Sequence, residues 1–114
     1  MSRILIVDDD PLIAMMLADW VSELGHETLG PSYSAESAMA LIETLPPHAA
    51  IVDVSLGSTS GYPVAELLVQ KNIPFVFATG HGEGAVIPRF AGAGLLAKPF
   101  GFADVSAALD RMLA

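Results

Sequence analysis

Carboxylates stand directly after two apolar runs of this chain. Asp8, Asp9 and Asp10 follow the run that ends at Val7, and Asp53 ends a second run. Carboxylates gathered at one place repel one another unless a cation joins them. Because neither Cys nor suitably spaced His accompanies these oxygens, they favour a hard ion, Mg²⁺ with Mn²⁺ as the alternative. The acids therefore predict a divalent metal site beside Asp53, whose carboxylate could attack phosphorus and form an acyl phosphate.

Two other polar residues, Thr79 and Lys98, stand at the ends of later apolar runs. A metal ion, a lysine and a hydroxyl group around one carboxylate would stabilise a phosphoryl group through their charge and position. Taken singly, a threonine at the end of a strand or a lysine on the surface is ordinary. The combination of both with Asp8, Asp9 and Asp53 in one chain predicts a functional site.

Short apolar runs and helical patterns alternate along the chain. Strands are predicted at residues 3–7, 27–30, 49–52, 73–78 and 95–97. Helices with apolar residues at every third or fourth position lie between them, and they begin after Asp10, after Ser34, at Pro63 and at Phe102. The buried stripe of the first helix is expected to start at Leu12, and that of the last helix at Phe102. A helix within residues 80–94, which hold five glycines and a proline, would be short and weak.

Five repeats of strand then helix predict an α/β fold, a (βα)5 doubly wound parallel sheet with helices on both faces and right-handed crossovers. No linker or sequence repeat interrupts this order, so residues 1–114 are expected to form one domain. In open parallel sheets, ligands bind beyond the carboxyl ends of the strands. The polar residues described above all follow predicted strands, so the fold would bring them to one edge of the sheet.

Composition excludes several classes of function. Thirteen acids against five bases give a net charge of −8, which argues against direct nucleic-acid binding because such binding needs clustered Lys and Arg. The chain has no cysteine, which fits a reducing, cytoplasmic location. No signal peptide is recognisable, and no apolar stretch approaches the roughly 18 residues that span a membrane. We therefore expect a cytoplasmic protein that binds neither nucleic acid nor membrane.

Four motifs, "ILIVDDDP", "AIVDVSLGSTSG", "FVFATG" and "LLAKPF", resemble in order and spacing the receiver domains of bacterial two-component response regulators. The resemblance covers essentially the whole chain and implies a flavodoxin-like, CheY-like sheet with strand order 2-1-3-4-5. It also implies a role for each site residue. Asp53 would accept the phosphoryl group, Asp9 would bind Mg²⁺ directly, and Asp8 would bind it largely through water.

The resemblance assigns the remaining residues of the site as well. The backbone carbonyl of Ser55 would be a further metal ligand, Thr79 would bond a phosphoryl oxygen, and Lys98 would pair with the phosphoryl group. The Lys98–Pro99 peptide bond would be cis, a geometry that only a bond to proline adopts at low cost.

Within this family the segments "PFVFATGH" and "IPRFAGAGLLAKPF" resemble the FAT GUY receivers. These are mostly single-domain proteins of alphaproteobacteria, several of them tied to general stress signalling. Ordinary receivers place an aromatic switch residue where this chain has Leu95, and the FAT GUY group also lacks it. His81 departs from the Gly or Tyr that the subgroup places there. Without the aromatic residue, we expect residues 80–94 to reorder on phosphorylation instead.

The expected function is that of a stand-alone phosphoacceptor. A histidine kinase or a histidine phosphotransfer protein would phosphorylate Asp53, and a downstream protein partner would sense the result. The chain would catalyse its own phosphorylation and hydrolysis without being an enzyme in the usual sense. Three alternatives stay open: a phosphatase of the haloacid dehalogenase type, a pseudo-receiver that serves only as an interaction module, and the N-terminal receiver of a longer regulator with an output domain.

Overall fold

Five parallel strands form the central sheet in the order β2-β1-β3-β6-β7. The computed structural model describes residues 2–80, 90 and 93–114. The strands of this sheet are β1 (Arg3–Val7), β2 (Glu27–Ser32), β3 (Ala49–Asp53), β6 (Phe75–Thr79) and β7 (Gly94–Ala97). Two further strands, β4 (Ser55–Leu56) and β5 (Thr59–Ser60), pair antiparallel. Counted without this small hairpin, the strands have the order 2-1-3-4-5, so the predicted fold class is confirmed.

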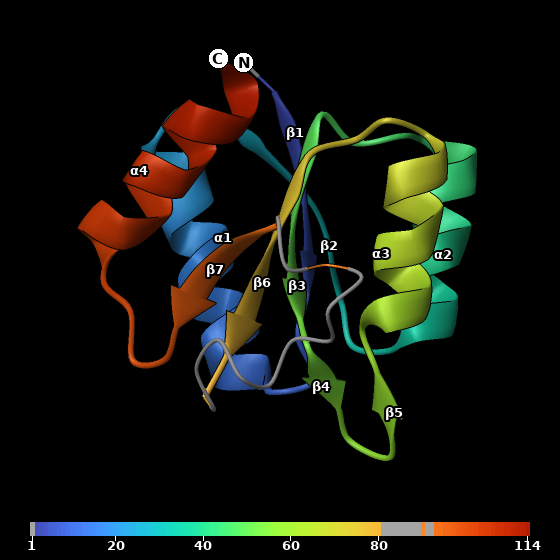
Figure 1. The fold of residues 1–114 in the computed structure, drawn as a ribbon. Coiled ribbons are helices and arrows are strands. Elements are labelled where there is room, and N and C mark those ends of the chain that lie inside the picture. The colour runs from blue at the N-terminus through green and yellow to red at the C-terminus, as the bar shows by residue number, and fades with distance from the viewer. Residues whose placement is uncertain (1, 81–89, 91–92) are drawn as a thin grey trace.

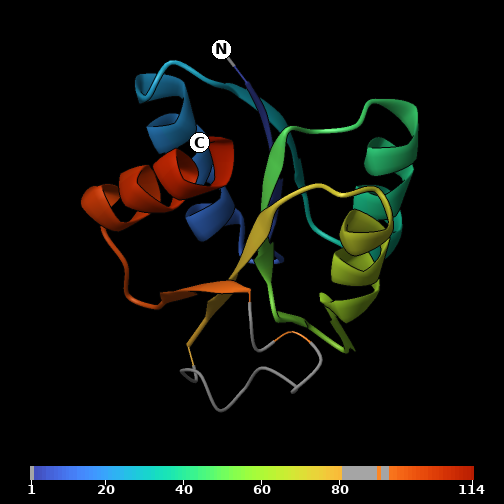
Figure 2. The ribbon, with the colours of Figure 1, turned by 45° about the horizontal axis from the view of Figure 1, so that its top comes forward.

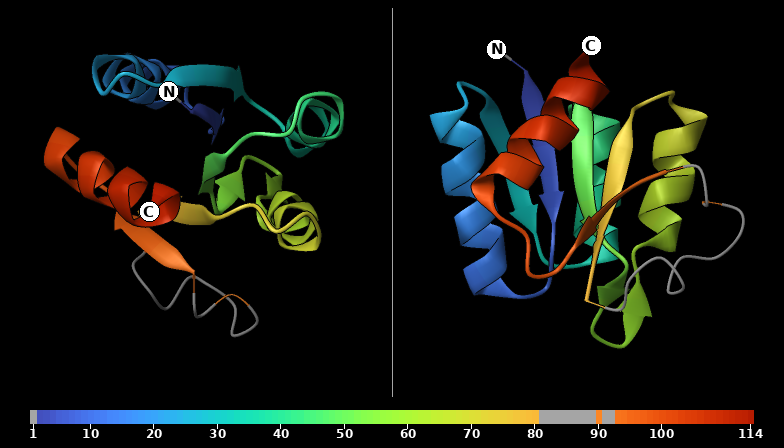
Figure 3. Two further views of the ribbon diagram at one scale, coloured as in Figure 1. Left: turned by 90° about the horizontal axis from the view of Figure 1, so that it is seen from above. Right: turned by 60° about the vertical axis from the view of Figure 1, so that its left-hand side comes forward.

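Four helices in the described part of the chain cover the sheet, and they are α1 (Pro11–Glu23), α2 (Ala35–Thr44), α3 (Tyr62–Gln70) and α4 (Phe102–Leu113). Helices α1 and α4 lie on one face, and α2 and α3 lie on the other (Figures 1 and 2). Seen from above, the molecule has three layers (Figure 3). Any helix within the segment of residues 80–94 falls largely outside the described residues.

Each face of the sheet has its own apolar core. Side chains of α2 and α3 pack on one face and those of α1 and α4 on the other, and the two clusters share no residue. Strand β3 is buried along its whole length, because a central parallel strand is covered from both sides. Successive residues of a strand point to opposite faces, so Phe77 belongs to the α2–α3 core and Val76 and Ala78 to the other.

Helix starts follow the local sequence. The carboxylate of Asp10 accepts a hydrogen bond from the backbone N–H of Leu12, with Pro11 in the first turn, as expected of an N-cap. The side chain of Ser34 caps α2 by accepting from the N–H of Ser37. The predicted starts of both helices, after Asp10 and after Ser34, are confirmed. The Lys98–Pro99 bond is cis as expected, and a second cis bond joins Gly30 to Pro31.

Three local expectations were wrong. Leu12 is 79% exposed rather than buried, because it lies on the outer face of α1, opposite the face of Ala14, Leu17 and Val21 that packs on the sheet. Phe102 is 39% exposed and meets the ring of Trp20 edge-on at 6.0 Å between centroids. No strand was predicted between Asp53 and Pro63, but this segment contains the β4–β5 hairpin. Among the described residues, no helix has the length and apolar character needed to cross a bilayer.

Candidate phosphoacceptor and metal site

The structure brings the predicted site residues together at one edge of the sheet. Asp8 directly follows β1, Asp53 ends β3, Thr79 ends β6, and Lys98 directly follows β7. The carboxyl ends of β1, β3 and β6 face the end of the molecule where the β4–β5 hairpin lies (Figure 1). The backbone N–H of Lys98 donates to the carbonyl of Thr79 at 2.8 Å. This bond holds the ends of the last two strands in register beside the acids.

Lys98 is the cation of the site. Its ammonium donates a hydrogen bond to Oδ2 of Asp53 at 2.9 Å and lies 3.5 Å from Oδ2 of Asp8. Burial alone would lower the pKa of this ammonium. The hydrogen bond to Asp53 and the negative charges of both aspartates outweigh burial and raise the pKa of Lys98 above its ordinary value. Lys98 therefore stays charged, and it bridges two carboxylates that would otherwise repel each other.

Asp8 is a buried carboxylate held in an unfavourable environment. Its side chain is 1% exposed, and its Oδ1 accepts from the backbone N–H of Asp10 at 2.9 Å. Burial raises the pKa of Asp8 from 3.8 to about 6 against the lowering effect of that hydrogen bond, and the nearby charge of Asp53 adds to the rise. Oδ2 of Asp8 is buried, and apart from its ion pair with Lys98 at 3.5 Å it has no hydrogen-bond partner among the described residues. A buried acceptor left in this state is costly, so this oxygen is available for a ligand.

The three predicted carboxylates fit a divalent metal ion. Asp8, Asp9 and Asp53 each offer an oxygen, and these oxygens all lie within 4.8 Å of one another. Asp9 is exposed while its two partners are buried, so the cluster opens to solvent on one side. Hard oxygen donors and a buried oxygen without a hydrogen bond suit Mg²⁺ or Mn²⁺.

A cavity of about 300 Å³ lies over these groups. Its lining includes Asp9, Asp53, Thr79 and Lys98, together with Ser55. The backbone N–H of Ser55 donates to Oδ1 of Asp53 at 3.0 Å, which leaves that carboxylate held from two sides. The cavity thus places a carboxylate, an ammonium group and a buried hydroxyl residue around one space large enough for a phosphoryl group.

Gly61 supports the phosphoacceptor from behind and was not predicted. Its N–H donates to the carbonyl of Val54 at 2.9 Å, and a Cβ at this position would collide with the backbone oxygen of Asp53. Only glycine permits so close an approach of two backbone segments. The sequence signal was a glycine two residues before the helix-opening Pro63, but nothing in the local sequence shows which backbone segment it approaches. His81, which departs from the subgroup pattern, lies outside the described residues.

Comparison with known proteins identifies the class. Residues 4–110 match the response regulator receiver domain, so the chain belongs to the receiver domain family of two-component systems. The predicted resemblance to the receiver domains of response regulators is confirmed. Because the chain belongs to the receiver domain family, the alternative of a phosphatase of the haloacid dehalogenase type is wrong. Receiver domains are signalling proteins rather than conventional enzymes, and they bind Mg²⁺ at an acidic pocket of the kind described above.

Curated relatives of this chain include two regulators that are longer than the chain itself. The phyllosphere-induced regulator PhyR of Methylorubrum extorquens is 35% identical over 98% of this chain and 43% of its own length. The positive alginate biosynthesis regulatory protein of Pseudomonas aeruginosa is 35% identical over 96% and 46%. The chain thus spans about half the length of these curated relatives.

Solved structures give a similar result. The solution structure of SdrG from Sphingomonas melonis Fr1 is 42% identical with a TM-score of 0.88, covering 100% of this chain and 98% of that one. The crystal structure of PhyR from Brucella abortus is 33% identical with a TM-score of 0.87, covering 98% and 47%. The fold therefore occurs both as nearly a whole solved chain and as half of a longer one.

Proposed function

We propose that this chain accepts a phosphoryl group on Asp53 from the phosphohistidine of a histidine kinase or a histidine phosphotransfer protein. The observation that carries the proposal is the contact of 2.9 Å between the Lys98 ammonium and Asp53 beneath the cavity, with two more carboxylates within metal-binding distance. Carboxylates gathered around one cation lower the stability of the fold, but the same charges can position and stabilise a phosphoryl group during its transfer.

The transfer exchanges one bond for another. The carboxylate of Asp53 forms an O–P bond while the P–N bond of phosphohistidine breaks, and the imidazole leaves as a neutral ring because its other nitrogen carries a proton. Lys98 neutralises charge on the phosphoryl oxygens, and the hydroxyl of Thr79 donates to one of them. The N–H of Ser55 keeps Asp53 oriented. Water later attacks the acyl phosphate, returning Asp53 to its carboxylate form.

Asp8, Asp9, Asp53 and the backbone carbonyl of Ser55 would hold a Mg²⁺ or Mn²⁺ ion. When bound, such an ion supplies positive charge that offsets the negative charge of the three carboxylates and the phosphoryl group. The role of Asp8 follows from its buried oxygen without a hydrogen bond. The role of Asp9 follows from its position on the solvent side of the cluster.

An apolar cavity beside the site supports a protein as the phosphoryl donor. It has a volume of about 390 Å³ and is lined by Ile13, Met16, Lys98, Pro99 and Phe100. Lys98 lines this cavity and the phosphoacceptor cavity alike, so a partner seated here could present a phosphohistidine to the adjacent site. Leu12 and Met15, which lie on the same helix as Ile13 and Met16, are exposed apolar residues as well.

The similarity to PhyR supports a place in a stress phosphorelay of the cytoplasm. One solved PhyR, from Bartonella quintana, is described as an anti-anti-sigma factor, and it is 28% identical to this chain with a TM-score of 0.86. We propose that residues 1–114 act as one receiver unit of the FAT GUY type whose output passes through contact with a downstream protein. A pseudo-receiver without phosphorylation, or a receiver joined to an output domain, are the alternatives that experiment must separate.

Intact mass spectrometry tests the proposal. The purified chain is incubated with Mg²⁺ and a small phosphodonor, and then with phosphorylated histidine kinases. We expect the mass of one phosphoryl group to be added, and we expect Asp53→Ala to abolish the addition. Asp9→Asn should slow it, whereas Asp10→Asn should not, because asparagine caps a helix about as well as aspartate. Failure of the wild-type chain to gain a phosphoryl group from any donor would favour the pseudo-receiver.

A further inference from the structure

The turn of the β4–β5 hairpin lies beside one of the metal-binding carboxylates. Gly57 in this turn adopts a positive φ of 71°, and a Cβ added to it would lie 3.5 Å from Oδ2 of Asp9. Asp9 is the exposed member of the carboxylate cluster. A segment that follows β3 therefore borders a metal ligand that follows β1.

The hairpin is fastened to the core next to its turn. Leu56, which precedes Gly57, is 6% exposed and belongs to the α2–α3 core. It pairs antiparallel with Thr59, and the hydroxyl of Thr59 donates to the carbonyl of Leu56 at 3.2 Å. The turn thus cannot move away from Asp9 without drawing a buried leucine out of the core, which is unfavourable.

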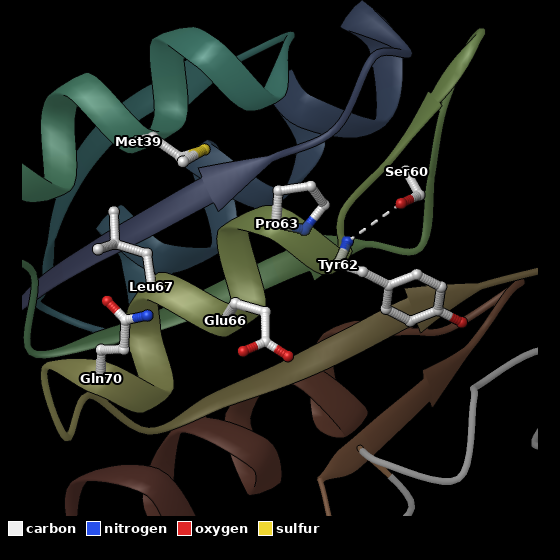
Figure 4. A pocket seen from close by; sticks show the side chains of 7 residues that line it. All are labelled: Met39, Ser60, Tyr62, Pro63, Glu66, Leu67 and Gln70. Atoms are coloured by element: carbon white, nitrogen blue, oxygen red, sulfur yellow. Dashed lines mark hydrogen bonds between the residues drawn. The ribbon is translucent and has the colours of Figure 1, made fainter.

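The base of the hairpin is fastened as well. The backbone N–H of Gly61 donates to the carbonyl of Val54 at 2.9 Å, and Ser55 pairs with Ser60 across the two short strands. Figure 4 shows the bond of 3.3 Å from the backbone N–H of Tyr62 to Oγ of Ser60, where the hairpin meets α3. Ser55, whose backbone carbonyl is the fourth proposed metal ligand, therefore belongs to a hairpin that is held at both ends.

Metal ions differ in how much freedom they need from their ligands. Mg²⁺ demands a near-ideal octahedron with oxygens at about 2.0–2.1 Å, whereas Ca²⁺ accepts more oxygens at about 2.3–2.6 Å in flexible geometries. A site whose ligands are held at a fixed spacing therefore favours the smaller ion. A site whose ligands can move apart loses this preference.

We infer that the β4–β5 hairpin fixes the spacing between Asp9 and the Ser55 carbonyl, and that it thereby gives the metal site its preference for Mg²⁺ over Ca²⁺. The inference rests on the metal site of the proposed function. Leu56 acts through Ser55, and Gly57 acts through Asp9, so both are positioning residues. Glycine suits this turn because it adopts a positive φ easily and leaves the space beside Oδ2 of Asp9 open.

Nuclear magnetic resonance titrations of the whole chain with Mg²⁺ and, separately, with Ca²⁺ test the inference. The amide signals of Asp9 and Ser55 report binding, and the ratio of the two dissociation constants measures the preference. We expect the wild-type chain to bind Mg²⁺ more tightly than Ca²⁺. In Leu56→Ala and Gly57→Ala, the affinity for Mg²⁺ should fall by about 10-fold, the scale of losing an outer contact of a metal ligand. The affinity for Ca²⁺ should stay within about twofold.

Matched variants separate positioning from general loss of stability. Gly25→Ala imposes the same backbone strain, at a φ of 87°, but no atom of the described residues lies within 4 Å of the added Cβ. Leu109→Ala truncates a buried leucine of the other core. Both should leave the ratio unchanged. Gly57→Asn tolerates the positive φ but places a side chain beside Asp9, so the ratio should fall although the fold keeps its stability in urea.

The outcomes distinguish this inference from the function on which it rests. A wild-type ratio in folded Leu56→Ala and Gly57→Asn overturns the role of the hairpin alone. An equal loss of preference in Gly25→Ala and Leu109→Ala does the same, and so does a wild-type chain that binds Ca²⁺ as tightly as Mg²⁺. A wild-type chain that binds neither metal overturns the proposed metal site and the inference together.

Discussion

The two ends of the sheet use polar groups in opposite ways. At the amino end, Nδ1 of His48 accepts from the backbone N–H of Arg3 at 2.8 Å, and Nδ1 of His26 accepts from that of Ser2 at 3.2 Å. The Arg3 guanidinium donates to the carbonyl of Pro46 at 2.8 Å, although no group in the described part of the chain accepts from its buried Nε. These contacts join the start of β1 to its neighbours.

The carboxyl end gathers like charges instead. Three carboxylates lie within 4.8 Å of one another, and Lys98 is the cation that contacts Asp8 and Asp53 in the described structure. The same sheet is therefore held together at one end and carries stored repulsion at the other. We therefore expect variants at the carboxyl end to change phosphorylation and the free energy of unfolding independently. Variants at the amino end should change the free energy of unfolding alone.

The largest effect is expected from Lys98→Met. Removing the cation should slow phosphorylation of Asp53 by about 100-fold or more, the scale of losing one preorganised electrostatic contact to developing charge. Time-resolved intact mass spectrometry measures the rate. Lys71→Met is the matched control because Lys71 pairs with Glu43 at 2.7 Å rather than with a residue of the phosphoacceptor site. A rate for Lys98→Met that matches this control would show that the ammonium is not part of the chemistry.

Asp8→Asn should separate stability from function. In EDTA the variant should be more stable than the wild-type chain by about 1–3 kcal/mol near neutral pH, because a buried ionised group with a raised pKa is removed. The stabilisation that Mg²⁺ gives to the wild-type chain should shrink at the same time. Urea denaturation with EDTA or Mg²⁺ measures both quantities. A variant that is less stable in EDTA would mean that Asp8 contributes to the fold rather than straining it.

The pH dependence of stability provides a second test of the role of Asp8. The folded-state pKa of Asp8 is about 6, above its ordinary value of 3.8. Between these values the folded chain binds more protons than the unfolded chain, so Asp8 makes stability rise as the pH falls through this window. The stability advantage of Asp8→Asn in EDTA should therefore shrink as the pH is lowered from neutral toward about 4. Urea denaturation at a series of pH values measures the difference, and a constant difference would contradict the assignment.

The smallest effect is expected at the amino end. His48→Ala removes the acceptor for the Arg3 backbone N–H and should lower the free energy of unfolding by about 0.5–1.5 kcal/mol, the net value of one hydrogen bond. Phosphorylation should stay within about twofold of the wild-type rate, since distant sites act independently. Thermal denaturation and the mass assay check the two parts. If His48→Ala stayed folded but lost phosphorylation, the expected difference between the two ends of the sheet would be wrong.

Much of the fold was predictable because local signals agree with one another. Apolar runs, Asp10 and Ser34 as caps, and helix-opening prolines all indicate the same alternation, and strand ends are correct within a residue or two. Parallel strands place their carboxyl ends at one edge, so the gathering of Asp8, Asp53, and Lys98 followed from the order of elements alone.

The structural features that could not be predicted from the sequence depend on tertiary contacts. The β4–β5 hairpin consists of two-residue strands whose Ser, Gly and Thr residues also suit a loop. The apolar periodicity indicated a buried stripe on α1, but the apolar character of Leu12 hid that this residue lies on the outer face of the helix. The approach of Gly57 to Asp9 joins two distant segments with no periodic signature. The burial that raises the pKa of Asp8 likewise exists only once the sheet has formed.

Mapping the modified residue tests the central claim most directly. After incubation with Mg²⁺ and a phosphodonor, borohydride reduction converts an aspartyl phosphate to homoserine, and peptide mass spectrometry locates the altered position. We predict that the change lies at residue 53, and that Lys98→Met shows little change at this position. Modification at Asp8 or Asp9 instead, or at no aspartate while the chain stays folded, would contradict it.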